Sequence, residues 1–196
     1  MISRNTLISR KGIFVTACLL VIGFVGCISI PLGDPEKAKV DDKLVGAWLS
    51  KPSDDGKQTL FTVVQYDSRT CLVTQFGFEK DGDNMKGSGR FDWKMWMVDI
   101  KGTTFASLEM KNPQISLEPT TDRFAAAKIV RSGDTITLQL VKDDFVKGAK
   151  TPSELEKLIG ENVNNAAMYD DALTLVRVGA DQKEAVGKML ESFGGK

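Results

Sequence analysis

The side chains of this 196-residue sequence that are able to do chemistry are few and widely separated. There is no histidine, so the general base of Ser-His-Asp and Cys-His systems and the commonest metal ligand in proteins are both missing. Cys71 stands alone in an apolar stretch, which is typical of a buried core thiol rather than of a nucleophile. We therefore expect no catalytic residue among the cysteines of the folded domain.

The acidic residues form patterns that only partly match functional ones. The acid pairs at 143–144 and 170–171 are able in principle to act as general acid and base, but each lies beside an expected turn or helix start, where Asp serves as a cap or a solvated charge. The run DGDN at 81–84 begins like a calcium loop, and the pattern fails at the next two residues. A glycine-rich hairpin turn, in a loop over 80–89, is the better interpretation. We expect no metal, no cofactor and no enzymatic activity.

Chemistry of a different kind is expected at Cys27. Residues 12–26 form an uncharged run of fifteen residues behind a basic stretch, shorter than the roughly 20 apolar residues that span a bilayer and typical of an export signal. The ending Val25-Gly26-Cys27 resembles the lipobox of bacterial lipoproteins, with Phe24 in place of the usual Leu. The resemblance implies cleavage after Gly26 and acylation of Cys27 by a diacylglycerol and a third chain such as palmitate. The alternative is an uncleaved anchor helix with an incidental cysteine.

This interpretation predicts where the protein is found and how the rest of the chain is divided. Because Ile28 and not Asp follows Cys27, the resemblance implies a cell-envelope protein on the periplasmic face of the outer membrane. Removal of the signal peptide 1–26 leaves 170 residues with 23 basic and 26 acidic side chains, a net charge of about −3 that predicts no binding to nucleic acid. Residues 27–40 are predicted to be a flexible tether, and residues 41–196 to be one domain.

The domain is predicted to be mainly β. Many of its apolar stretches alternate with polar residues, as Ile136, Leu138 and Leu140 do with their neighbours, which indicates strands with one buried face. Short hairpin-type connections join most of them. Eight antiparallel up-and-down strands remove their exposed edges by closing into a barrel. The expected strands are 47–50, 59–66, 70–79, 90–100, 103–110, 123–131, 135–141 and 172–178.

Two helices are predicted in addition to the strands. Thr151 and Glu154 have the spacing of a capping box around Pro152, which indicates a helix over 152–163 before the last strand. A second helix is expected from Asp181 to Phe193, at the C-terminus. Its apolar stripe is predicted to be Ala185, Met189 and Phe193, and both helices are expected to lie against the barrel.

One motif resembles a known family. Gly46-Ala47-Trp48, at the start of the first expected strand, is similar to the G-x-W signature of lipocalins and other calycins. The resemblance implies a lipocalin-like barrel whose base is closed by Trp48, with an arginine from a late strand across the indole ring. Arg177 is the expected arginine and Arg131 the second choice. The sequence departs from lipocalins in placing a helix before Arg177 rather than after it, and the alternative for Trp48 is a core aromatic residue of another β fold.

Two functions from different classes remain open on this basis. The first is a binding module whose barrel holds a small hydrophobic ligand such as a lipid. The second is a structural or interaction protein with a filled barrel, in which an exposed patch of Trp96 with Met97 contacts an envelope protein. The expected lining of the cavity in the first case is Phe76, Phe78, Phe91, Trp93, Met95 and Phe105.

Overall fold

The computed structural model describes residues 28–111 and 123–193 of the chain. The predicted signal peptide, with Gly26 and Cys27, lies outside the described residues. No helix within the two described ranges has the length and apolar character needed to cross a membrane.

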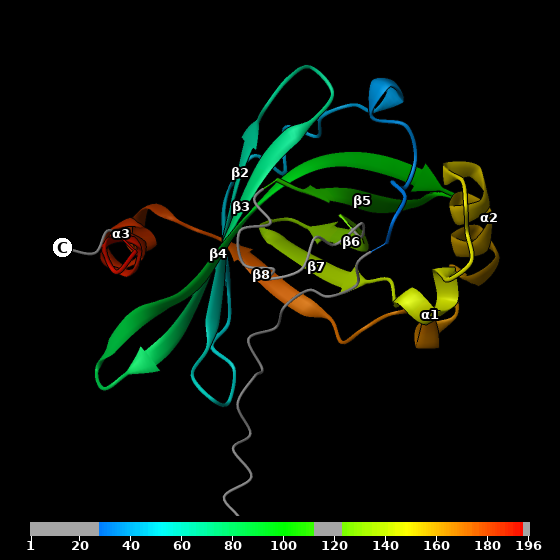
Figure 1. Cartoon of the computed structure of the whole chain (residues 1–196). Helices are drawn as coiled ribbons and strands as arrows, with labels where there is room; N and C mark the ends of the chain where they lie inside the picture. Colours follow the sequence, from blue (N-terminus) through cyan, green and yellow to red (C-terminus); the bar gives the residue numbers. More distant parts are fainter. Residues whose placement is uncertain (1–27, 112–122, 194–196) are drawn as a thin grey trace, which may run out of the picture.

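Eight antiparallel strands form a closed barrel, as Figure 1 shows, and this confirms the predicted fold class. Each strand pairs with its neighbours in the sequence, and β1 closes the barrel against β8 through Trp48↔Arg177, Leu49↔Val176 and Ser50↔Leu175. The topology is that of a lipocalin-like up-and-down barrel. The strands are β1 (Gly46–Ser50), β2 (Gln58–Gln65), β3 (Cys71–Asp81), β4 (Asn84–Ile100), β5 (Thr103–Met110), β6 (Phe124–Ser132), β7 (Thr135–Leu140) and β8 (Leu173–Arg177).

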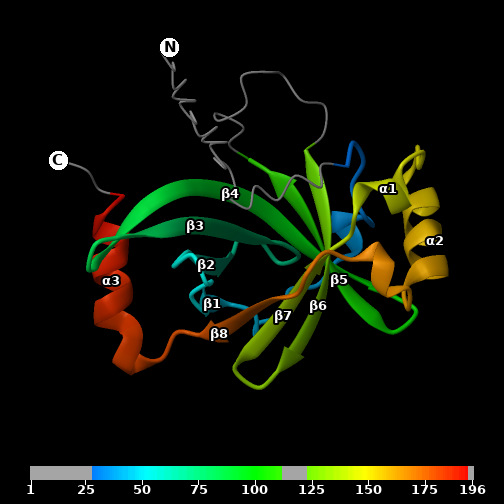
Figure 2. The same cartoon turned by 90° about the horizontal axis from the view of Figure 1, so that it is seen from below.

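The barrel has two ends, which we name by residues that lie near them. At the Trp48 end, β1 begins, β8 ends and the turn between β6 and β7 lies; Figure 2 shows this turn at the bottom of the barrel. At the Gln75 end, β3 ends and β4 begins. Because neighbouring strands are antiparallel, β5 also ends and β6 also begins at the Gln75 end.

The connection between β3 and β4 differs from the predicted loop over 80–89. The two strands stay paired as far as Asp81 and Asn84, and Gly82, with a φ of 63°, lies in the turn between them. The register shifts between Gly77 and Phe78, which is the signature of a bulge that bends the hairpin. The glycines and charges of this segment indicated a loop from the sequence, but they lie in an extended ladder that projects from the barrel (Figure 1).

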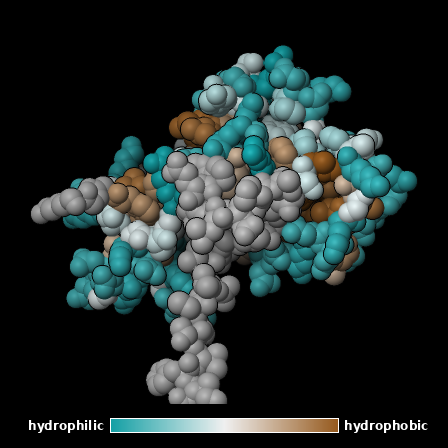
Figure 3. Space-filling model, in the orientation of Figure 1, coloured by the Kyte–Doolittle hydropathy of each residue, from teal (hydrophilic) through white to brown (hydrophobic). Residues whose placement is uncertain are grey.

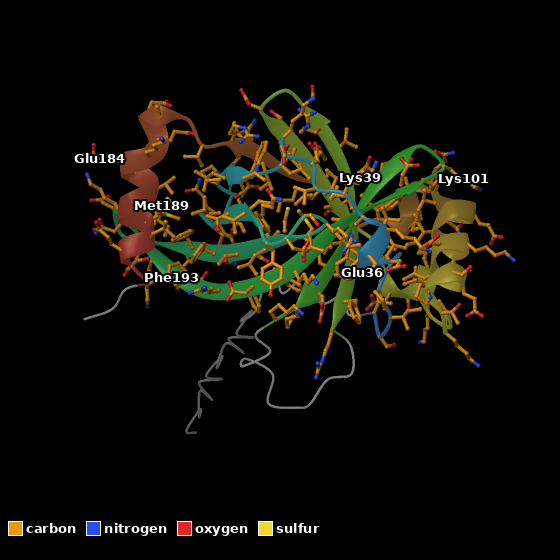
Figure 4. The ribbon with its side chains drawn as sticks, turned by 90° about the horizontal axis from the view of Figure 1, so that it is seen from above. Glu36, Lys39, Lys101, Glu184, Met189 and Phe193 are labelled. Carbon is orange, nitrogen blue, oxygen red and sulfur yellow. The ribbon has the colours of Figure 1, made fainter. Side chains whose placement is uncertain are left out.

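The C-terminal helix supports this projecting hairpin from outside the barrel. Helix α3 (Lys183–Glu191) follows the short 3-10 helix η3 (Ala180–Gln182) and packs its apolar side against Leu60, Phe76 and Phe78. The ring of Phe193 lies edge-on to the rings of Phe76 and Phe78, with centroids 5.3 and 5.2 Å away. Figure 4 shows Met189 on this helix and Phe193 just beyond its end, with Glu184 on the side away from the barrel.

The buried side of α3 differs in one position from the predicted stripe. Ala185 is exposed, and Val186 is buried in its place. Val186, Met189 and Phe193 have spacings of three and four residues, which keep them on one face of a helix better than two spacings of four. Gly87 of β4 makes room for this face, since a Cβ at that position would lie 2.8 Å from Cζ of Phe193.

The connection from β7 to β8 contains the one helix predicted before the last strand, as α2 (Pro152–Asn162), and two short helices that were not predicted. The short helices are α1 (Asp143–Val146) and the 3-10 helix η2 (Ala166–Met168). Thr151 is the N-cap of α2, and its Oγ1 accepts a hydrogen bond from the backbone N–H of Glu154 at 3.2 Å. The reciprocal bond of a capping box is shifted by one residue, because the Glu154 carboxylate accepts from the N–H of Lys150 at 2.7 Å. The fully buried Leu155 and Ile159 of α2 pack against Phe105 on the outer face of the barrel.

The first described residues do not behave as the predicted flexible tether. Ile28 pairs with Phe124 of β6, donating to its carbonyl at 2.6 Å and accepting from its N–H at 3.0 Å. Leu32 is 1% exposed, and its N–H donates to Ser107 Oγ. We call residues 28–33 the N-terminal strap. Beyond it lies the 3-10 helix η1 (Pro35–Lys37), and Figure 4 places Glu36 and Lys39 on the segment that leads toward β1.

Candidate functional site

Trp48 closes one end of the barrel interior. Its side chain is 1% exposed, and its indole N–H donates to the carbonyl of Leu44 at 2.8 Å. The guanidinium carbon of Arg177 lies 4.2 Å from the centroid of the indole ring, within the range of a cation–π contact. Arg177 therefore occupies the position that the lipocalin resemblance assigns to a late-strand arginine, and Arg131 is an exposed residue of β6.

Arg177 also ties the start of β1 to the end of β8. Its guanidinium donates to the carbonyl of Val45 at 2.9 Å and to the carbonyl of Lys43, and its Nε lies 3.4 Å from a carboxylate oxygen of Asp134. Gly46 has a φ of 137°, and a Cβ there would lie 2.6 Å from Nη1 of Arg177. Glycine is needed both for the backbone conformation and for the approach of the guanidinium. These residues build the Trp48 end of the barrel.

An apolar cavity of about 70 Å³ lies inside the barrel. Trp93 and Met95 of β4, two of the six residues expected to line a cavity, are in its wall. The space exists because one side of the wall is built from the small side chains of Ala106, Ala125 and Ala127, of which Ala106 and Ala127 face each other across β5 and β6. The remaining wall residues are Leu44, Trp48, Phe61, Val63, Val73, Gln75, Leu108, Ile129, Ile136, Leu138, Leu140 and Leu175.

The other four expected residues do not line this cavity. Phe91 and Phe78 both contribute to the wall of a second pocket, described below. Phe76 and Phe78 are on the outer face of β3, beneath α3, and Phe105 is on the outer face of β5, against α2. The prediction failed for these three because the helices cover the outer face of the sheet. Strands that are buried on both sides carry apolar residues in both phases, so the period-two pattern does not reveal which phase faces inward.

Gln75 is the one polar side chain in the wall of the cavity, and it is not among the six residues expected there. It is 5% exposed, although its side chain carries an amide. One signal in the sequence could have selected it. Gln75 lies on β3 between the inward-facing Val73 and Gly77, so it is a polar residue in the inward phase of an apolar strand. Moving an amide from water into apolar surroundings costs free energy unless a hydrogen bond compensates it, which makes Gln75 unusual in a core position.

Gln75 also lines a second pocket, of about 50 Å³, toward the Gln75 end of the barrel. This pocket is formed by the first residues of β2, the last residues of β3 and the first residues of β4. Its wall contains charged and hydroxyl side chains, so it differs chemically from the apolar cavity. The pocket residues besides Gln75 are Lys57, Gln58, Thr59, Gly77, Phe78, Glu79, Ser88, Gly89 and Phe91. The amide of Gln75 thus stands between an apolar space and a polar one.

Other residues whose side chains could take part in chemistry lie where a structural role explains them. Cys71 is buried, and burial together with the charges of Asp67, Asp42 and Asp41 raises the pKa of its thiol, which keeps it protonated and unreactive. Asp143 and Asp144 are in the first turn of α1, where a carboxylate is favoured by the helix dipole. Among residues 28–111 and 123–193, no three Cys, Asp or Glu side chains are grouped so that they could hold a metal ion.

Fold and site together define a lipocalin-like barrel with a small internal cavity, closed at one end by a Trp–Arg pair. The chain matches no protein-family model, and it matches neither a curated protein nor a solved structure. The assignment to this class of fold therefore depends on the strand topology and on the geometry of Trp48 and Arg177.

Proposed function

We propose that this protein is a membrane-anchored lipoprotein whose barrel binds a small amphiphilic molecule with a short apolar chain. The observation that carries the proposal is the position of Gln75, a buried amide between an apolar cavity and a polar pocket. The apolar part of a ligand would occupy the space beside the three alanines. Its hydroxyl or carbonyl group would pair with the amide of Gln75, which lies in the walls of both spaces.

The size of the cavity restricts the ligand class. At about 70 Å³ it is smaller than the ~150 Å³ apolar cavity that admits benzene, so it suits a slender alkyl chain rather than a ring or a branched lipid. A short primary alcohol or the end of a fatty acid has the required shape. Each methylene group moved from water into the cavity contributes about 0.8 kcal/mol, so chain length governs affinity until the space is filled.

The lipid anchor is the second part of the proposal, and it comes from the sequence. Cys27 follows a basic stretch, a short uncharged run and a lipobox-like ending. Multiple acyl chains on one residue hold a protein firmly to a bilayer. With Ile28 after the cysteine, the favoured location is the periplasmic face of the outer membrane, in the cell envelope.

The alternative function is a filled barrel that contacts an envelope protein. The surface expected for this contact, Trp96 with Met97, is not an exposed patch. Trp96 is 2% exposed, with its indole N–H donating to the carbonyl of Leu32 at 2.8 Å, and Met97 packs into the interior cluster around Trp93. The described surface seen in Figure 3 is largely hydrophilic, with small separate hydrophobic areas. The large exposed apolar residues of the described chain are Val64, Tyr66, Val130 and Val176. The three valines lie on β2, β6 and β8, and Tyr66 follows the end of β2.

Binding is tested by titrating the purified protein with a series of straight-chain primary alcohols in a calorimeter. We expect the affinity to rise about fourfold for each added methylene, which corresponds to about 0.8 kcal/mol, and then to stop rising when the cavity is full. Ala127→Leu fills the cavity and is expected to lower the affinity about five- to 150-fold, because the overlap of ligand and side chain costs about 1–3 kcal/mol.

The control for this variant is Val130→Leu, on the outer side of the same strand β6, which is expected to bind like the original protein. Alcohols that fail to bind the original protein at any chain length would exclude the ligand-binding function and favour the filled barrel. Equal affinities of the Ala127→Leu and Val130→Leu variants would place the binding site outside the cavity.

Gln75→Leu is expected to separate stability from binding. Leucine has a similar volume and replaces an amide that is 5% exposed in an otherwise apolar wall, so the free energy of unfolding should rise by about 1–2 kcal/mol. Alcohol affinity should fall by about three- to tenfold with the loss of one hydrogen bond, while the affinity for an alkane of equal length stays unchanged. Urea unfolding and the same titrations measure both effects. Lower stability with unchanged alcohol binding would mean that the amide has a purely structural role.

A further inference from the structure

The N-terminal strap crosses the outer wall of the barrel over three neighbouring strands. It begins at β6, where Ile28 pairs with Phe124 beside the place at which β7 ends. It passes β5, where the N–H of Leu32 donates to the buried hydroxyl oxygen of Ser107 at 3.1 Å. It reaches β4, where the carbonyl of Leu32 accepts from the indole N–H of Trp96 at 2.8 Å. Backbone pairing, two buried side-chain hydrogen bonds and the burial of Ile28 and Leu32 hold the strap in place.

The strap also has a defined direction. Phe124 is the first residue of β6, so Ile28 lies at the Gln75 end of the barrel. The following residues lead to the opposite end, where the carbonyl of Leu44 accepts the indole N–H of Trp48. The polypeptide before Ile28 therefore joins the barrel at the Gln75 end, the same end at which the polar pocket lies.

We propose that the strap mounts the barrel rigidly on the membrane, with the Gln75 end facing the lipid surface. This inference rests on the proposed acylation of Cys27. Cys27 is bonded directly to Ile28, and consecutive Cα atoms are about 3.8 Å apart, so acyl chains on Cys27 start within one residue of the barrel wall. No length of free chain remains between the lipid and the strap to let the barrel turn over.

The orientation has a consequence for the ligand. With the Gln75 end toward the bilayer, the polar pocket lies at the lipid headgroups, and the apolar cavity lies behind it. An amphiphile that leaves the bilayer reaches Gln75 without crossing the periplasm. The Trp48 end, closed by the indole and guanidinium groups, faces away from the membrane.

The orientation is tested with full-length lipoprotein reconstituted in phosphatidylcholine vesicles that contain a lipid with a nitroxide quencher on its headgroup. A fluorophore is attached to a single introduced cysteine, in Lys111→Cys at the Gln75 end or in Ser132→Cys at the Trp48 end, both exposed positions. The buried thiol of Cys71 is replaced by alanine in both proteins. We expect the fluorophore at position 111 to be quenched several-fold more strongly than the one at position 132.

A matched variant isolates the strap as the cause. Insertion of about 20 Gly and Ser residues between Cys27 and Ile28 keeps the anchor and gives the barrel a free chain with an average reach of about 25 Å. We expect the difference between the two positions to disappear in this variant. Equal quenching at both positions without the insertion would overturn the rigid mount while leaving the anchor intact. A protein that does not float with the vesicles would overturn the proposed acylation, and the mount with it.

Discussion

Replacement of Trp48 by alanine is expected to lower the free energy of unfolding by about 3–5 kcal/mol, the usual cost of truncating a buried tryptophan. The side chain is 1% exposed and lies in the wall of the cavity. Its loss removes the hydrogen bond to Leu44 and leaves the guanidinium of Arg177 without its aromatic partner. Urea unfolding followed by circular dichroism measures the change.

The contribution of the arginine is separated with Arg177→Met, which keeps the length of the side chain and removes its charge. We expect a loss of about 2 kcal/mol, since the carbonyls of Lys43 and Val45 lose their donor and the cation–π contact disappears. The control is Arg131→Met, at an exposed position of β6. Its free energy of unfolding should stay within about 0.5 kcal/mol of that of the original protein. Combined with Trp48→Phe in a double-mutant cycle, Arg177→Met should show a coupling of about 0.5–2 kcal/mol. Equal effects of the two arginine variants would mean that Arg177 does not brace the Trp48 end.

Replacement of Cys27 by serine is expected to abolish acylation completely and to leave the protein with its signal peptide. The thiol is the group that receives the diacylglycerol, and a hydroxyl does not replace it in the processing that the lipobox resemblance implies. Labelling of cells with a radioactive or alkyne-tagged palmitate measures the incorporation. The control is Cys71→Ala, because Cys71 is buried in the barrel and should not affect labelling. Unchanged incorporation in the Cys27→Ser protein would contradict the lipid anchor.

The fold could be predicted in detail because its strands obey local rules. Alternating residues such as those of β7 mark one buried face, and the short turns between neighbours fix an up-and-down order. The capping-box spacing of Thr151 and Glu154 similarly fixed the start of α2. These signals depend on residues close together in the chain, so the sequence alone is enough to read them.

The binding site could be predicted only in part, because it depends on which face of each strand a helix covers. Phe76 and Phe78 contact α3, more than 100 positions further along the chain, and nothing near them in the sequence indicates that contact. Ala106, Ala125 and Ala127 leave space for a cavity only because barrel closure brings them into one wall with Trp93, which the sequence around them does not indicate. The strap is a similar case: its Pro and Gly content indicated a tether, whereas the buried contacts of Leu32 are with residues 64 and 75 positions away.

The central claim, a cavity that holds an amphiphile, is tested most directly by extracting the protein after gentle purification from its own membranes. The organic extract is analysed by mass spectrometry for compounds present in proportion to the protein, in the original chain and in the Ala127→Leu variant. We expect a short-chain amphiphile to accompany the original protein and to be absent from the variant, because the added leucine fills the space beside Trp93. The same compounds in equal amounts from both proteins, or none from the original protein, would contradict a ligand in the barrel.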